Sequence, residues 1–315
     1  MESILLSVNT VGPILILVLI GIILRHRGII DDEFAEKANK LAYTYSLPFS
    51  IFWEIFHADL RSVINYKLVF YAFGSIVALV ALLCLTAPRF IHGQKRRGAF
   101  IQASFRSNFA ILGYVMGVSV CGEAGALPVI MLIPIVVTTY TVTSIMVLAG
   151  FSDGGGDKHL LRRVVKAVLT NPLIWGNVIG ILFNVFAIPM PKIVATSVKY
   201  LAAMAAPLAL IAIGAQLKLP RRSDDLCPLL ACCCIKLIIA PLFFVLPAIW
   251  IGFKPAELCA IYLAHCSPTG LSSYAMSYGM GSDYEFTGQA IVFSTLFSFA
   301  TIFVGLFLLS SFGYL

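Results

Sequence analysis

Charged side chains are scarce in this chain of 315 residues. Asp, Glu, Lys and Arg make up 12% of the sequence, and hydrophobic residues make up 60%. An ordinary soluble domain has roughly 25% charged residues, so this chain cannot cover a soluble surface of its size. Its apolar runs are long enough to cross a hydrocarbon core of about 30 Å. The composition excludes a soluble globular enzyme and predicts an all-α polytopic membrane protein.

Patterns typical of metal binding and catalysis are also missing. Seven of the eight cysteines lie within or at the edge of apolar segments, where a thiol behaves as a small hydrophobic group. His265 and Cys266 are adjacent, so on a helix they point about 100° apart, which disfavours a hydrolase built on this pair. No metal, cofactor or enzymatic activity is expected. The net charge of +7 comes from residues in short loops between apolar segments, so nucleic acid is not an expected partner.

Ten apolar segments are separated by polar, glycine or proline residues, and each is predicted to span the membrane as a helix. They cover residues 9–25, 35–56, 66–87, 100–120, 126–150, 166–188, 195–217, 227–250, 256–280 and 286–310. With the N-terminus outside, the cytoplasmic loops carry fifteen Lys and Arg residues and the external loops carry four. This bias predicts a multi-pass protein of the plasma (inner) membrane with both termini external.

The two halves of the chain resemble each other at an offset of 159 residues. Three proline and glycine positions recur: Pro13, Gly21 and Pro48 match Pro172, Gly180 and Pro207. Each half holds five spans, and an odd number inserts the second half upside down, as in many secondary transporters. The sequence therefore predicts two inverted five-helix repeats, residues 1–152 and 164–315, joined by a short cytoplasmic linker at residues 153–163.

The fourth and ninth spans are poor lipid-facing helices. Their polar, glycine and proline residues include Arg106, Ser107, Asn108, Gly113, Gly117, His265, Ser267, Pro268, Thr269, Gly270, Ser272 and Ser273. Because free backbone groups are costly in hydrocarbon, broken helices survive only inside the protein or beside a water-filled cavity. Two facing breaks would present half-helix N-termini, which attract anions. The alternative is that the small residues only allow close helix packing.

Four segments carry a resemblance to a known family. They are SFRSNFAILG in the fourth span, NPLIWGNVIGIL in the sixth, APLALIAIGAQL in the seventh and SPTGLSSYAMSYG in the ninth. Together they resemble the bacterial branch of the auxin efflux carrier family of membrane transporters. The resemblance implies ten helices in two inverted repeats, with helices 4 and 9 broken where they cross. It also implies an elevator-type movement and small organic anion substrates such as malate, malonate or indole-3-acetate.

The resemblance also implies site residues. Asn108 matches the asparagine of the family's first crossover, and Pro268, Thr269 and Gly270 match the start of the second. Val115 and Ser273 stand where many members have the crossover prolines, so the unwinding is expected to rest on glycines and Pro268. The candidate substrate-binding residues are Ser107, Asn108, Gly113, Tyr114, Lys236, Ser267, Pro268, Thr269, Gly270, Ser272 and Ser273.

Arg106, Lys236 and His265 lie inside predicted spans, where a charge costs roughly 2.5 to 3.5 kcal/mol without a partner. Arg106 either faces the cavity or snorkels to the cytoplasmic headgroups. Lys236 lies deeper, and either faces the cavity or pairs with a helix C-terminus or a carboxylate. His265 is a candidate for coupling a proton to transport, with a hydrogen bond to a backbone carbonyl as the alternative, and Arg106 is a second possible coupling residue.

These features favour a permease or efflux carrier for small organic carboxylate anions, with its site at the crossover of helices 4 and 9. The expected partners are the anion, the lipid bilayer and a second copy of the chain in a homodimer. An anion channel and an uptake symporter coupled to sodium or protons remain alternatives. The sequence leaves open which anion is carried and in which direction.

Overall fold

The computed structural model describes residues 13, 16–57, 65–109, 116–117, 127–152, 162, 165–166, 169–216 and 223–315. These residues form helices, with a single isolated β-bridge within the described ranges. A helix at Ile16–His26 comes first. The first half continues with α2 (Asp32–Leu41), the π-helical turn η1 (Ala42–Ser46), α3 (Leu47–Phe56), α4 (Tyr66–Thr86), the short 3-10 helix η2 (Ala87–Arg89), α5 (Gln94–Phe105) and α7 (Leu127–Gly150).

The second half is also helical. Its elements are α9 (Pro172–Val185), α10 (Lys192–Ala203), α11 (Ala205–Gln216), α12 (Ser223–Cys234), the π-helical turn η4 (Ile235–Ile239), α13 (Ala240–Ile251), α14 (Pro255–Cys266), α15 (Ser272–Gly279) and α16 (Tyr284–Ser311). The predicted linker falls almost entirely outside the described residues.

Several helices are long and apolar enough to cross a bilayer, which confirms a polytopic all-α membrane protein. Within the described ranges these are Tyr66–Arg89, Met131–Gly150, Lys192–Ala215 and Leu226–Ile251. Tyr284–Ser298 and Ala300–Ser311, which meet at an angle of 43°, are long and apolar enough when taken together. The fourth and ninth predicted spans are not continuous helices. The α5 helix ends at Phe105 and the α14 helix ends at Cys266, because the residue after each helix, Arg106 or Ser267, is extended.

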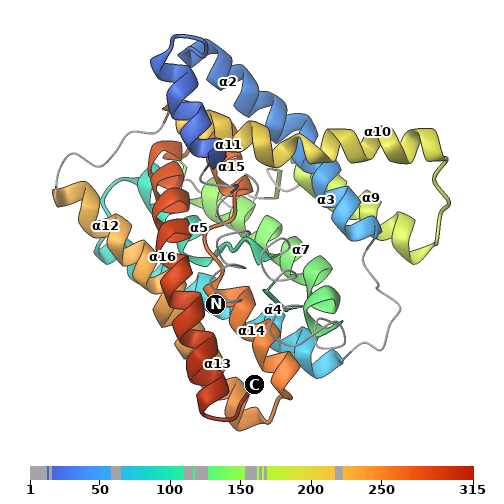
Figure 1. Ribbon diagram of the computed structural model, residues 1–315, viewed down its shortest axis with the longest axis vertical. Helices are drawn as coiled ribbons and strands as arrows, with labels where there is room; N and C mark the ends of the chain where they lie inside the picture. Colours follow the sequence, from blue (N-terminus) through green and yellow to red (C-terminus); the bar gives the residue numbers. More distant parts are fainter. Residues whose placement is uncertain are drawn as a thin grey trace.

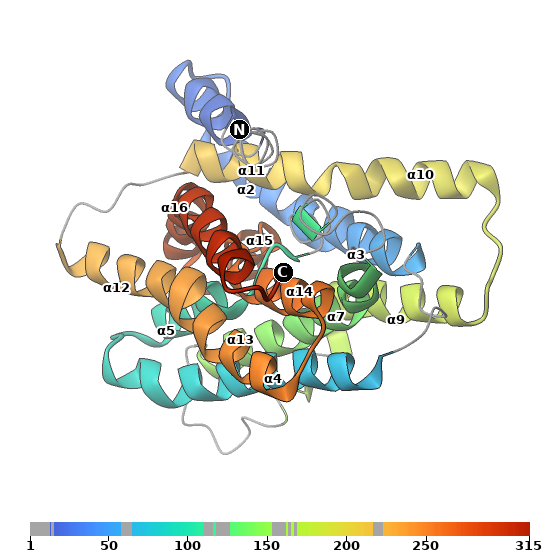
Figure 2. The same ribbon diagram turned by 60° about the horizontal axis from the view of Figure 1, so that its bottom comes forward.

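The helices gather into two groups (Figures 1 and 2). In one group α3 packs along α9 and α10, and α11 packs along α2; we call these helices, with Ile16–His26, the first bundle. The second bundle consists of α4, α5, α7, α12 with η4 and α13, α14, α15 and α16. The α15 helix contacts α2 and α11, and α7 contacts α3 and α9. The two bundles therefore meet along α7 and α15.

Glycines allow the first bundle to pack closely. A Cβ atom added to Gly21 would lie 2.3 Å from the carbonyl oxygen of Ile211, and one added to Gly214 would lie 2.1 Å from the carbonyl oxygen of Val18. Only glycine permits such an approach of two helix backbones, a common device in membrane helix packing. Helix Ile16–His26 and α11 are thus joined at backbone contact distance.

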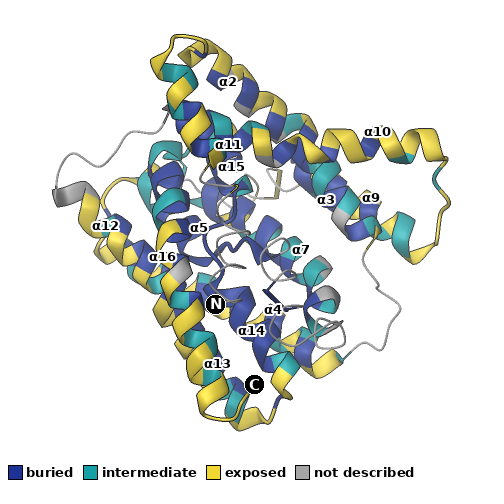
Figure 3. Cartoon of the chain, viewed as in Figure 1, coloured by how far each residue is buried: buried dark blue, intermediate teal, exposed yellow. Residues whose placement is uncertain are grey.

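Burial follows the expected membrane pattern (Figure 3). Residues 258–266 of α14 are all buried, because this helix is surrounded by α4, α7, α13 and α16. The outer helices instead expose large apolar side chains: Ile193 on α10 is 84% exposed and Trp250 on α13 is 86% exposed. Such apolar outer faces suit contact with lipid tails, not water.

Candidate functional site

The two broken helices cross each other at their ends. Ser107, just after α5, and Thr269, just after α14, form an antiparallel β-bridge. The Asn108 N–H donates to the Pro268 carbonyl oxygen at 2.9 Å, and the Gly270 N–H donates to the Arg106 carbonyl oxygen at 3.1 Å. We call residues 106–108 and 267–270 the crossover. Its backbone bonds replace part of the helical hydrogen bonding that each break removes.

Local sequence explains the second break. Pro268 disfavours a helical conformation at the residue before it, and Ser267 is extended with φ −62° and ψ 143°. A Cβ atom on Gly270 would lie 3.1 Å from the Ser107 carbonyl oxygen, so glycine allows the two segments to approach. The expected unwinding at Pro268 and Gly270 agrees with this geometry.

The carboxyl end of α5 is satisfied by residues from the second half of the chain. The Thr269 hydroxyl donates to the Ala103 carbonyl oxygen at 2.9 Å. The Lys236 ammonium, on η4, donates to the Phe105 carbonyl oxygen at 2.8 Å. Unpaired carbonyl groups at a buried helix end are costly, so these two donors stabilise the break.

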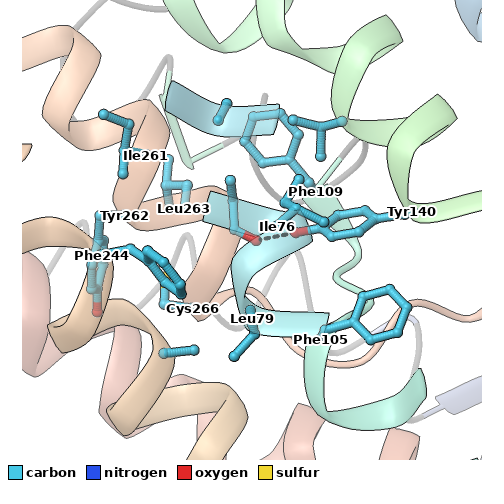
Figure 4. Packing of buried hydrophobic residues seen from close by; sticks show 14 of the residues in the cluster. Ile76, Leu79, Phe105, Phe109, Tyr140, Phe244, Ile261, Tyr262, Leu263 and Cys266 are labelled. Carbon is cyan, nitrogen blue, oxygen red and sulfur yellow. Dashed lines mark hydrogen bonds between the residues drawn. The ribbon is translucent and has the colours of Figure 1, made fainter. Parts of the chain in front are cut away.

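The carboxyl end of α14 is satisfied by hydroxyl groups. Tyr140 of α7 donates to the Ala264 carbonyl oxygen at 2.8 Å, and the dashed line in Figure 4 starts at the Tyr140 hydroxyl. The Ser267 hydroxyl donates to the Leu263 carbonyl oxygen at 2.6 Å. Figure 4 also shows the Tyr140 ring near Phe105 and Phe109, so both helix ends share one apolar environment.

A cavity of about 90 Å³ lies beside the crossover, between the two bundles. The crossover contributes a polar wall: Arg106, Ser107, Asn108 and Gly270, followed by Leu271 and Ser272 at the start of α15. The remaining lining residues are Leu47, Ser50 and Ile51 of α3, Val137 and Tyr140 of α7, and Ala205 and Ala209 of α11. A polar wall facing a mostly apolar one is common in sites for small ligands. We call this cavity the crossover pocket.

Arg106 lies inside the protein and does not snorkel to the surface. Arg106 is only 5% exposed and lines the crossover pocket. The guanidinium donates to the Ser272 hydroxyl from Nη2 at 2.7 Å and from Nε at 3.2 Å, and to the Ser144 hydroxyl from Nη1 at 3.4 Å. These bonds hold the guanidinium against the amino end of α15.

Asn108 contributes an amide to the same pocket. The residue is 8% exposed, and its side-chain Nδ2 is buried without a hydrogen-bond partner in the described part of the protein. Buried polar groups nearly always have partners, and an exception often marks a place where a ligand binds. Asn108 therefore brings an amide nitrogen without a partner among the described residues to the wall of this cavity.

Lys236 and His265, two titratable candidates, lie outside the pocket lining. Lys236 was a candidate for facing the cavity, but its ammonium caps α5, which is the helix C-terminus pairing given as its alternative. His265 is 1% exposed, hydrogen-bonds through Nε2 to the Ser75 hydroxyl at 2.9 Å, and stacks on Phe244. Both side chains, from η4 and α14, lie in the interior of the second bundle.

The other candidates divide in the same way. Ser107, Asn108, Gly270 and Ser272 line the pocket. Ser267, Thr269 and Ser273 are fully buried beside it, and Pro268 contributes a backbone carbonyl. Gly113, Tyr114 and Val115 lie outside the described residues.

Sequence reasoning missed the pocket residues of the other helices. Ser50 and Tyr140 are polar positions within apolar runs, which is a weak signal that was available. Leu47, Ile51, Val137, Ala205 and Ala209 carry no such signal, because their composition does not distinguish a pocket-facing side from a packed one.

A buried crossing of two broken helices, with a polar pocket between two membrane bundles, defines a class: a membrane transport protein. Comparison with known proteins agrees. The model of a family described as "Membrane transport protein" matches residues 6–305. The chain therefore belongs to this family, the auxin efflux carrier type of membrane transporter.

Two archaeal relatives align over nearly their whole lengths. An "Uncharacterized transporter" of Methanothermobacter thermautotrophicus is 24% identical over 299 residues, covering 94% of this chain and 96% of the relative. A second uncharacterized transporter, from Methanocaldococcus jannaschii, is 22% identical over 305 residues, covering 94% and 97%. Both alignments include the crossover region.

Proposed function

We propose that this protein is a secondary carrier of small organic carboxylate anions and that it binds them in the crossover pocket. The observation that carries the proposal is that Arg106 and Asn108, whose amide nitrogen has no partner among the described residues, line the same cavity. Among the residues that the structure describes, the thirteen that line the cavity include no Asp or Glu. A buried cation, free amide N–H groups and a lining without carboxylates together suit an anion.

The lining groups supply the chemistry that a carboxylate needs. Arginine presents a planar fork of N–H groups that matches a carboxylate in a two-bond arrangement. Asn108 adds a donor, and the amino end of α15, at Leu271 and Ser272, adds a favourable helix dipole. A carboxylate that bound here would exchange the Ser272 hydroxyl for the anion as a partner of Arg106.

The size of the pocket favours the smaller candidates. A cavity of about 90 Å³ has room for only a few water-sized groups, since one such group needs at least roughly 10–15 Å³. A three- or four-carbon dicarboxylate such as malonate or malate has this size, whereas indole-3-acetate is larger. We therefore propose malonate and malate as the first substrates to test.

The order of the helices supports the proposal of two inverted repeats. Adding 160 to the bounds of the α2–α3 segment, 32 and 56, gives 192 and 216, the bounds of the α10–α11 segment. Adding 161 to the bounds of α5, 94 and 105, gives 255 and 266, the bounds of α14. A duplication explains why both halves break a helix at equivalent positions.

The position of the pocket between the bundles supports an elevator-type step. In such a step the second bundle, which contains the crossover, would slide along the first bundle and carry the anion. An inside-negative potential drives each negative charge outward with about 2.3 kcal/mol per 100 mV, so export needs no coupled ion. We propose uniport efflux as the direction of net transport.

A thermal-shift screen of organic acids on the purified protein tests the proposal. Malonate and malate should raise the melting temperature with increasing concentration, because a ligand that binds the folded state stabilises it by mass action. The amides of the same acids should not. A screen in which the amides stabilise as much as the acids would contradict an anion site.

Asn108→Ala should weaken malonate binding about tenfold or more, because a hydrogen bond to a charged group contributes roughly 1.5–3 kcal/mol. Expression and melting temperature without ligand should stay near the wild-type values, since the amide Nδ2 has no partner to lose in the described structure. The measurement is isothermal titration of malonate into the purified variant.

Asn184→Ala is the matched control for this substitution. Asn184 donates to the Ile55 and Phe56 carbonyl oxygens, between α9 and α3 and away from the pocket. Its replacement should lower stability and leave the malonate affinity unchanged. Wild-type affinity in the Asn108→Ala variant would place the site elsewhere.

A further inference from the structure

Lys236 is a fully buried basic residue that the proposed substrate site does not use. It is 1% exposed and lies in η4, the π-helical turn between α12 and α13. Its ammonium donates to the Phe105 carbonyl oxygen at 2.8 Å and lies 5.9 Å from the centre of the Tyr140 ring. A buried lysine is expensive unless its charge has a function or a partner.

The partner of Lys236 is the end of a helix. Phe105 is the last residue of α5, and the carboxyl end of a helix carries a partial negative charge of about half an electron. Arg106, the next residue, lines the crossover pocket. Without compensation the end of α5 would direct negative potential toward the place proposed for an anion.

The two crossing helices are compensated differently. The donors to the α14 end, Tyr140 and Ser267, are neutral hydroxyl groups. At the α5 end one donor is a hydroxyl, from Thr269, and the other is the Lys236 ammonium. A charge-assisted bond is roughly twice as strong as a neutral one, so Lys236 stabilises the first break more than a hydroxyl would.

We propose that Lys236 is a positioning residue whose buried positive charge caps α5, holds the crossover together and removes the repulsion that this helix end would exert on an anion in the pocket. The effect on an anion in the pocket rests on the proposed function. The capping of α5 and the support of the crossover do not, because they concern the backbone alone.

Three substitutions separate the charge from the hydrogen bond. Lys236→Arg keeps the charge, Lys236→Gln keeps a donor without the charge, and Lys236→Met removes both. Lys67→Met is the matched control, because the Lys67 ammonium also donates to a helix-end carbonyl, that of Ile251 at 2.9 Å, but at an exposed position far from the crossover.

Hydrogen–deuterium exchange of the ligand-free protein tests the positioning role. Peptides that contain the Asn108 and Gly270 amides should exchange about tenfold faster or more in Lys236→Gln and Lys236→Met, given the strength of a hydrogen bond to a charged group. Exchange should stay within about threefold of the wild type in Lys236→Arg and Lys67→Met. Wild-type exchange in Lys236→Gln, or equal acceleration in Lys67→Met, would overturn the proposal.

Titration with malonate and with malonamide tests the effect on the anion. A unit charge acting over about 10 Å at an effective dielectric constant of about 20 changes the affinity of an anion roughly tenfold. Lys236→Gln should therefore weaken malonate binding about tenfold and leave weak malonamide binding unchanged, and Lys236→Arg should restore malonate binding. An equal effect on both compounds would overturn the electrostatic role. If malonate does not bind the wild type, the proposed function fails, and the exchange experiment still decides the positioning role.

Discussion

Replacing Arg106 with glutamine is expected to abolish anion binding, with a loss of affinity of about a hundredfold or more. Among the described residues, the Arg106 guanidinium is the cation that lines the crossover pocket. Truncating a buried charge that meets a charged ligand typically costs about 2–5 kcal/mol or more. Glutamine keeps a polar head that can still reach Ser272, so the fold should survive. Equilibrium binding of malonate measures the effect.

Arg97→Gln controls for the loss of a positive charge from a nearby part of the chain. Arg97 lies on α5, which ends one residue before Arg106, but it donates to the Ile91 carbonyl oxygen at 2.6 Å and to the Pro88 carbonyl oxygen at 3.4 Å, away from the pocket. Its replacement should leave malonate binding unchanged. If Arg97→Gln and Arg106→Gln weaken binding equally, the effect comes from the overall charge and not from the pocket.

Replacing Gly214 with valine is expected to have the largest effect on stability. The added Cβ atom would lie 2.1 Å from the Val18 carbonyl oxygen and 3.0 Å from the Gly21 Cα, and both are backbone atoms of a neighbouring helix that cannot turn away. Helix Ile16–His26 would have to separate from α11. Overpacking of this kind costs about 1–3 kcal/mol or more, and a large fall in melting temperature and in monodisperse protein should follow.

Gly74→Ala is the matched control for Gly214→Val. Gly74 lies within α4, and apart from the helix's own nearby backbone no atom lies within 4 Å of the position of an added Cβ. Alanine is the better helix former by about 1 kcal/mol, so the melting temperature should stay the same or rise. A wild-type melting temperature in Gly214→Val would show that the helix contact is looser than the structure describes.

The membrane class, the helical fold and the approximate location of both breaks could be predicted from the sequence. Scarce charge and long apolar runs determine the class. Pro268, Gly270 and the polar run at Asn108 predict breaks, because their chemistry acts through neighbouring residues. The structure has α5 ending at Phe105 and α14 ending at Cys266, close to those residues.

The contacts of the buried charges could not be predicted. The depth of Lys236 indicates that its ammonium needs a partner, but the Phe105 carbonyl becomes available only because α5 ends there and meets η4 in three dimensions. Ala205 and Ala209 line the pocket because of the angle at which α11 meets the second bundle. Neither fact has a local sequence signal.

Uptake of labelled malonate into liposomes that contain the purified protein tests the central proposal most directly. Uptake should saturate with concentration and accelerate when unlabelled malonate is present inside, because a carrier returns faster when loaded. It should be lost in Arg106→Gln and kept in Arg97→Gln. An unsaturated, ohmic malonate current, or full uptake by Arg106→Gln, would contradict a carrier that binds its anion at the crossing of the two broken helices.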